Sequence, residues 1–218
     1  SLWDDLPFKE TDLPVTVQIK GARVRAWQGI PDITVDNAEQ MTVLEAPPWD
    51  AGMDLTNHAV EVDLAEVVAG PSRVGLKTSG MLVSVREDSG FIMRCTECRR
   101  VLRDGICSDC GPNAGNEDIR MRLVVDLDGA TAAVLVNKDA TLAALDLDVD
   151  AMRSKIDEIG EQGFVQHVRE QMLGRHLTVT GRSIVDEQGA MILADGCSME
   201  VHDPQMRASE LRAQWGWG

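Results

Sequence analysis

Four of the five cysteines fall in one short cluster, at Cys95, Cys98, Cys107 and Cys110. Their spacing, C-x2-C-x8-C-x2-C, forms two tight turns that each point two sulfur atoms inward, which is the ligand set of a tetrahedral metal site. Four protein thiolates leave no coordination position for water, so the cluster predicts one structural zinc ion. Disulfides are the alternative, but no secretory segment opens the sequence to favour them. Cys197 stands apart and is expected to be a small buried or edge residue.

Four arginines surround this cluster: Arg94, Arg99, Arg100 and Arg103. A zinc ion held by four thiolates carries two net negative charges, so these guanidinium groups either neutralise the metal site or hold phosphate groups.

Two further arginine pairs alternate with apolar residues in segments that we expect to form strands. Side chains two positions apart in a strand lie on one face, about 6.6 Å apart, so each pair predicts a short row of positive charge. Such a row contacts either a nucleic-acid backbone or the abundant carboxylates of an acidic surface. The pairs are Arg23 with Arg25 and Arg120 with Arg122, and Arg86 and Lys138 are expected beside the second pair.

Aromatic side chains, which stack on bases in single-stranded nucleic acid, are scarce: the chain has no Tyr, three Phe and five Trp. Trp27 is expected at a hairpin tip, where it either stacks on a base or contacts a neighbouring domain. Trp3 either lies on a sheet face or plugs an incomplete barrel. Phe91 is either a stacking platform or part of the small core around the cysteines.

The sequence offers no catalytic set. The acidic pairs have no nearby His, Lys or glycine-rich loop, and the nucleotide-binding pattern G-x-x-x-x-G-K-[ST] is absent. We therefore expect a protein that is not an enzyme, with carboxylates that solvate its surface.

The composition is that of an ordinary soluble protein with a net charge of −15. No apolar stretch could span a bilayer, and we expect a cytoplasmic location. The charge provides no overall positive field to attract nucleic acid. The 36 acidic residues stand against 16 Arg and only 5 Lys, which favours adaptation to concentrated salt over a merely acidic mesophilic protein.

The apolar periodicity predicts a mainly β protein with helices. Strands are expected at 73–85, 119–126 and 130–136, a helix at 152–172 interrupted near 160–163, and a hairpin at 175–201. Five strands with a helix between the third and fourth match the order of the OB barrel. The cysteine cluster follows the first strand, at the rim beside the surface that OB folds use for oligonucleotides.

An internal repeat links residues 21–29 with residues 181–189, because Gly, Gln and Gly recur 160 positions apart. Both segments predict hairpins, and the distance predicts two copies of one domain type. Too few residues precede the first copy for a full barrel. We therefore expect a truncated OB domain at 1–45, a linker with a short helix at 46–72, the zinc-containing OB domain at 73–203, and a C-terminal helix at 204–218.

With these motifs in place, residues 80–111 resemble the zinc-containing OB domain of archaeal replication protein A. Residues 17–36 resemble the closing strands of the preceding OB domain in haloarchaeal members. The resemblance implies binding of single-stranded DNA in replication, repair and recombination, and other subunits of that family as partners through the C-terminal helix. The expected contact residues are Trp3, Arg23, Arg25, Trp27, Arg86, Phe91, Arg94, Arg120, Arg122 and Lys138.

Two alternatives share this fold. A zinc-ribbon and OB accessory subunit would dock onto an enzyme, but there the ribbon precedes the barrel instead of interrupting it. An RNA-binding factor is the other alternative, because fold alone does not decide between DNA and RNA.

Overall fold

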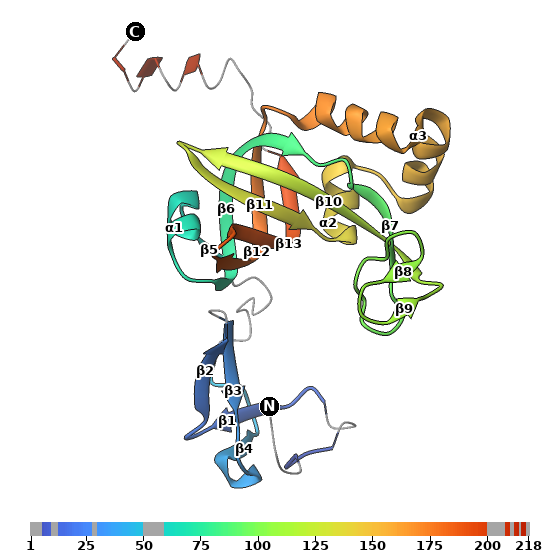
Figure 1. Cartoon of the computed structure of the whole chain (residues 1–218). Coiled ribbons are helices and arrows are strands. Elements are labelled where there is room, and N and C mark those ends of the chain that lie inside the picture. Colours follow the sequence, from blue (N-terminus) through green and yellow to red (C-terminus); the bar gives the residue numbers. More distant parts are fainter. Residues whose placement is uncertain are drawn as a thin grey trace.

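The computed structural model describes residues 6–9, 13–27, 30–49, 59–199, 208–209, 212–213 and 215–216 (Figure 1). Five strands of the central region form a closed barrel: β6 (Arg73–Val85), β10 (Asn116–Leu127), β11 (Ala130–Val136), β12 (His176–Asp186) and β13 (Gly189–Met199).

The pairing of these strands identifies the barrel. The hydrogen-bonded order is β6, β12, β13, β11, β10, and β10 pairs again with β6 to close the ring. All pairs are antiparallel except β11 with β13, which is parallel. This arrangement is that of the five-stranded OB barrel, so the predicted fold is confirmed.

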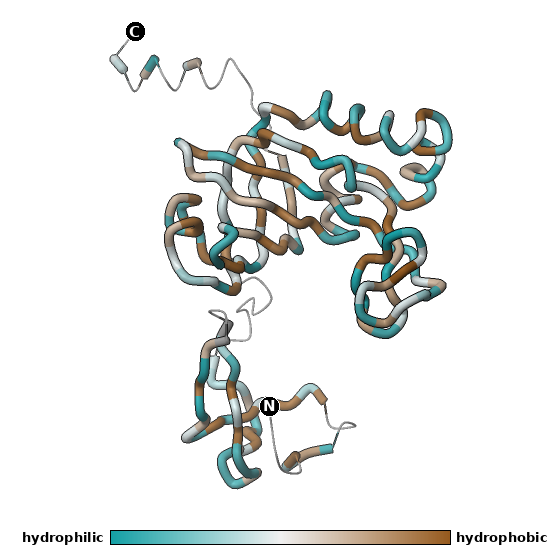
Figure 2. The backbone as a smooth tube through the Cα atoms, in the orientation of Figure 1, coloured by the Kyte–Doolittle hydropathy of each residue, from teal (hydrophilic) through white to brown (hydrophobic). Residues whose placement is uncertain are grey.

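Strict alternation of side chains builds the barrel core. Along β10, Ile119, Met121, Leu123 and Val125 are buried, whereas Arg120 and Arg122 point to the outer face. Figure 2 shows the same alternation of hydrophobic and hydrophilic residues along the barrel strands. Because one face of each strand is apolar, a shift of register by one residue would expose the whole core.

Two helices connect β11 to β12 at the end of the barrel: α2 (Lys138–Leu145) and α3 (Val149–Met172). Phe164, Val168 and Met172 of α3 are buried in the barrel core. The predicted interruption is confirmed, because Gly160 has a non-helical φ of 76°. The short α2, which begins at an Asn137 cap, was not predicted.

The cysteine arm (residues 90–115) leaves the barrel between β6 and β10. It contains β7 (Gly90–Arg94), β8 (Ile106–Cys107) and β9 (Gly111–Pro112). The β7 strand pairs with the first part of β10, from Asn116 to Arg120, so β10 runs from the arm into the barrel.

The short helix expected in the linker is present as α1 (Leu64–Ala69), preceded by β5 (Val60–Glu61). The Asp63 carboxylate accepts a hydrogen bond from the Ala65 amide at 2.8 Å, which caps the helix. Leu64 and Val67 are fully buried in the barrel core, so this helix packs on the barrel. The boundary at residue 73 stays a prediction, but packing of the OB unit begins before it.

Residues 13–49 form four short strands: β1 (Thr16–Ile19), β2 (Arg23–Trp27), β3 (Ile30–Thr34) and β4 (Met41–Leu44), with a 3-10 turn η2 at Ala38–Gln40. β1 pairs with β4 and β2 with β3, in two separate two-stranded sheets. Among the described residues up to 49, these strands close no barrel and Val35 is the one buried side chain. Assignment of this unit to a truncated OB domain stays a prediction.

The two repeat copies both contain a hairpin with a two-residue loop. Trp27 pairs with Ile30 in the first copy, and Asp186 pairs with Gly189 in the second. The pairing therefore matches the copies at an offset of 159 residues, one fewer than the sequence comparison predicts. The copies also differ because Gly21 separates β1 from β2, whereas Gly181 is a bulge inside the continuous β12.

Among the described residues, no helix combines the length and apolar character needed to cross a membrane. Trp3 and most of residues 204–218 lie outside the described residues.

Candidate metal centre and nucleic-acid interface

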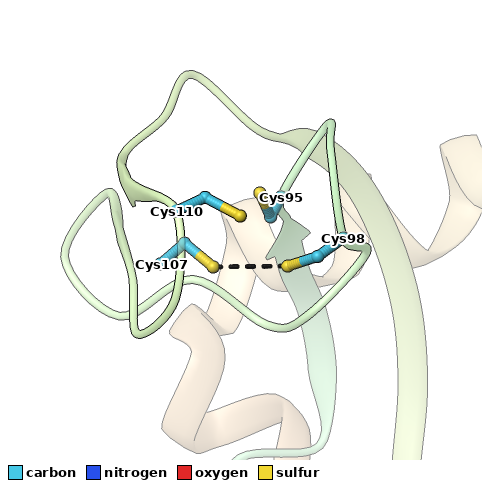
Figure 3. Close-up of side chains that lie close together, drawn as sticks. All are labelled: Cys95, Cys98, Cys107 and Cys110. Atoms are coloured by element: carbon cyan, nitrogen blue, oxygen red, sulfur yellow. Dashed lines mark hydrogen bonds between the residues drawn. The ribbon is translucent and has the colours of Figure 1, made fainter.

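The four clustered cysteines point at one another from the two turns of the arm (Figure 3). All four sulfur atoms lie within 4.8 Å of one another, and the Cys98 and Cys107 sulfurs are 3.4 Å apart. Four thiolates around one metal ion at about 2.3 Å would have sulfur–sulfur distances of about 3.8 Å, so the donor set fits a tetrahedral site. The cysteines are free thiols, not disulfides.

The arm supplies little else to hold itself together. Its buried side chains are Cys95, Leu102 and Cys107, in a cluster separate from the barrel core. The backbone amides of Asp109 and Cys110 lower the pKa of Cys107 to about 7, which favours the thiolate that a metal requires. Cys197 lies elsewhere, and burial raises its pKa to about 12, as expected of an inert thiol.

Asn113 joins the two cysteine turns, and no local sequence pattern singles it out. Its side-chain oxygen accepts hydrogen bonds from the Thr96 amide and hydroxyl, both at 3.1 Å, and from the Gly115 amide at 2.9 Å. The backbone N–H of Asn113 donates to the Gly105 carbonyl at 3.0 Å. One side chain therefore fixes the turn after Cys95 against the segment that follows Cys110.

We predict that Asn113→Ala weakens metal retention about ten-fold, because loss of a residue that orients metal ligands costs affinity on this scale. Metal release to increasing concentrations of a chelator measures the effect. Asn116→Ala, an exposed change at the start of β10, is the matched control and should release metal as the unchanged protein does. Equal release from both variants would contradict this role for Asn113.

The second arginine pair lies as its alternation predicts, on the outer face of β10. Asp88, in the turn between β6 and β7, accepts hydrogen bonds from the guanidinium groups of Arg120 and Arg122, both at 2.7 Å. Arg86 belongs to the same exposed turn, and its amide donates to the Arg122 carbonyl at 2.8 Å. The row of charge exists, and a carboxylate occupies it in this structure.

Arg94 and Lys138 join this row to form what we call the cationic face (Arg94, Arg120, Arg122 and Lys138). Arg94 forms an ion pair with Asp118. Burial raises the pKa of Asp118, but the Arg94 hydrogen bond, the Ile119 backbone amide, the Arg94 charge and, least, the Lys138 charge together leave that pKa below its usual value. The charges of Arg94 and Arg122 also act on Arg120, so the structure brings these four predicted residues together.

Two grooves flank the cationic face. The first, of about 1270 Å³, runs along β7 between the turn 86–89, the cysteine arm and α3, and Phe91, Arg120 and Arg122 line it. The second, of about 630 Å³, lies on the outer face of the barrel, and Arg94 lines it.

The second groove contains residues that sequence reasoning missed. Leu135 on β11 lies between Arg122 on β10 and Leu193 on β13, and Arg182 on β12 lies beyond Leu193. This row crosses four strands with an apolar middle and an arginine at each end. Within the described part of the chain, no carboxylate pairs with Arg182. Because the row forms only when distant strands pair, the sequence alone gives no signal for it beyond the exposed position of Arg182 after Gly181.

The other predicted contact residues are not part of the cationic face. Phe91 packs against the barrel core, and Arg153 covers its ring at 4.7 Å from the centroid, an environment that favours packing over base stacking. Arg23 and Arg25 share the exposed β2 strand, and Arg23 pairs with Asp36. Trp27 ends β2, and its side chain lies outside the described part of the structure, as does all of Trp3.

The fold and the site define this chain as an OB-fold protein with a four-cysteine arm inserted after the first barrel strand. No protein-family model and no curated protein sequence matches it. A solved replication protein A heterotrimer bound to single-stranded DNA is similar with a TM-score of 0.46 and 11% identity, over 94% of this chain and 55% of that chain. The present chain thus spans about half the length of the replication protein A chain that it matches.

Two further structures are similar. Yeast replication protein A bound to single-stranded DNA has a TM-score of 0.39 and 14% identity, over 63% of this chain and 85% of that one. The S. pombe Stn1–Ten1 complex has a TM-score of 0.28 and 11% identity, over 67% of this chain and 73% of that one. The OB assignment rests on the strand order and pairing of this chain itself.

Proposed function

We propose that this chain binds single-stranded DNA on the outer face of its barrel, in the manner of replication protein A, and is not an enzyme. The observation that carries the proposal is the cationic face, which lies on β7, β10 and the start of α2 between two grooves. The β10 and β11 strands are the second and third of the OB barrel, the strands on which OB folds bind oligonucleotides. The resemblance of residues 80–111 to the archaeal family supports a role in replication, repair and recombination.

Phosphate groups would lie along the arginines, and bases would lie on the aliphatic side chains of the second groove. Leu135 and Leu193 give this surface an apolar middle, and Arg182 extends it to β12. In concentrated salt, long-range attraction is screened within about 3 Å, so short contacts of this kind would carry the affinity.

The cysteine arm would hold one structural zinc ion. By ordering the turn that begins at Cys95, the ion would fix the end of β7 and therefore the position of Arg94. Other subunits of a complex would bind through the C-terminal residues, and a cytoplasmic location fits these roles. Contacts by Trp3, Arg23, Arg25, Trp27, Arg86 and Phe91 stay predictions. The arm interrupts the barrel between β6 and β10, which argues against the accessory-subunit alternative.

Titration of labelled oligo-dT, its duplex and an RNA strand across a salt series tests this function. We expect tight binding of the single DNA strand alone. Arg182→Gln should weaken that binding and reduce the salt slope by about one, because one phosphate contact is lost. Lys155→Gln, which removes a positive charge on α3 outside both grooves, is the matched control. If none of the three nucleic acids binds at low or high salt, the proposed function is wrong, and preference for RNA would favour the RNA-binding alternative.

A further inference from the structure

Asp88 is a surface carboxylate that contacts two arginines of the cationic face at once. A single oxygen, Oδ2, accepts hydrogen bonds from both Arg120 and Arg122 at 2.7 Å. The turn that carries Asp88 is fixed to β10, because the Ser89 hydroxyl accepts a hydrogen bond from the Arg122 amide at 2.9 Å. One negative charge therefore bridges two of the four positive charges of the cationic face.

The three side chains differ in their contact with solvent. Arg120 is only 14% exposed, whereas Arg122 and Asp88 are 45% and 46% exposed. Burial raises the pKa of Asp88, but the hydrogen bond and charge of Arg122, together with the charge of Arg120, leave that pKa below its usual value. Asp88 is thus ionised at neutral pH. Because its side chain is already about half exposed, it can turn fully into water.

We propose that Asp88 is a built-in competitor for the phosphate group of the nucleic acid, which must displace it to bind between Arg120 and Arg122. This inference rests on the proposed function and identifies how the same site is regulated. A carboxylate and a phosphodiester each carry one negative charge and offer acceptor oxygens to guanidinium groups. The exchange therefore leaves one negative charge against the two arginine charges in both states.

The competitor has a consequence for the response to salt. When a phosphate replaces Asp88, the DNA releases a bound cation, but the freed carboxylate attracts cations again, so the net release is small. Asp88 would also keep the two arginines from binding diffuse anions in the free protein. Asp88 would then be displaced from the two arginines only by a ligand that presents several phosphates and bases at once.

Asp88→Asn tests the proposal, because it keeps the size of the side chain and one acceptor oxygen but removes the charge. With labelled oligo-dT at low salt, we expect binding about five-fold tighter than that of the unchanged protein, on the scale of one exposed ion pair. The salt slope should become steeper by about one. Asp88→Glu should restore the original slope. Glu187→Gln, which removes the same charge in the exposed turn between β12 and β13, outside both grooves, is the control and should change neither quantity.

The outcomes separate the two proposals. Tighter binding by Asp88→Asn with a steeper slope supports the competitor, as does binding by this variant alone. If the unchanged protein binds and Asp88→Asn binds equally or more weakly, Asp88 instead positions the arginines, and the competitor role is wrong although the proposed function stands. If neither protein binds at any salt concentration, both proposals are wrong.

Discussion

Replacing Cys107 with serine is expected to release the metal and disorder the cysteine turns, while the barrel melts at a lower temperature. The arm has one buried apolar residue besides two of its own ligands, namely Leu102. Ordering roughly twenty residues costs about 1–2 kcal/mol each in backbone entropy, which so small a core does not offset. We therefore expect metal binding to supply the folding energy of the arm, as it does in small metal-dependent domains.

Metal content and limited proteolysis measure this result. We expect cleavage of the variant within residues 95–113 under conditions that leave the unchanged protein intact. Cys197→Ser is the matched control, because it makes the same chemical change at a buried cysteine outside the cluster. That variant should keep its metal even if burial of the hydroxyl lowers its stability. A Cys107→Ser protein that retains metal and melts like the unchanged protein would refute the metal assignment.

Gly181→Ala is expected to cost about 3–5 kcal/mol of unfolding free energy, which is a large part of the stability of a typical domain. A Cβ atom at this position would lie 2.1 Å from the Leu193 carbonyl oxygen and 3.0 Å from the Ala194 Cα. These are backbone atoms of the adjacent barrel strand, so relief of the overlap requires separation of β12 from β13. The positive φ of Gly181, 152°, adds strain for any other residue.

Urea unfolding of Gly181→Ala and Gly189→Ala distinguishes overlap from strain. Gly189 also has a positive φ, 115°, but a methyl group added to its Cα would meet no atom within 4 Å, so its substitution tests the dihedral alone. We expect the Gly189 variant to lose about 1–2 kcal/mol. Equal losses in the two variants would show that the close approach of β12 and β13 is not what requires Gly181.

The barrel was predictable because its signals are local. Period-two alternation in residues 119–126 and 130–136 fixes the strand faces, and the Asp128–Gly129 turn joins the strands. The interruption of α3 was also visible at Gly160. In contrast, α2 is short and largely composed of Ala and Leu, without a clear amphipathic period, so it was missed. The packing of α1 was missed because its sequence shows a helix but not the partner that buries it.

The candidate site was predictable only in part. Spacing alone brings the four cysteines together, and alternation places Arg120 and Arg122 on one face. Their shared partner Asp88 lies more than thirty positions away, and the pairing depends on how the turn between β6 and β7 meets β10. Arg182 joins the site through strand pairing across the barrel. Contacts of this range follow from topology and register, which no local pattern encodes.

The continuity of β10 has a mechanical consequence. Its first part, Asn116 to Arg120, pairs with β7 of the cysteine arm, and the part that follows pairs with β11 and β6 in the barrel. A force applied to the arm would therefore act on the pairing of β10 with β6 that closes the barrel, because β10 is one continuous strand from the arm into the barrel. In hydrogen exchange, the amides on either side of Met121 should open as one cooperative unit, and metal loss should speed exchange well into the barrel.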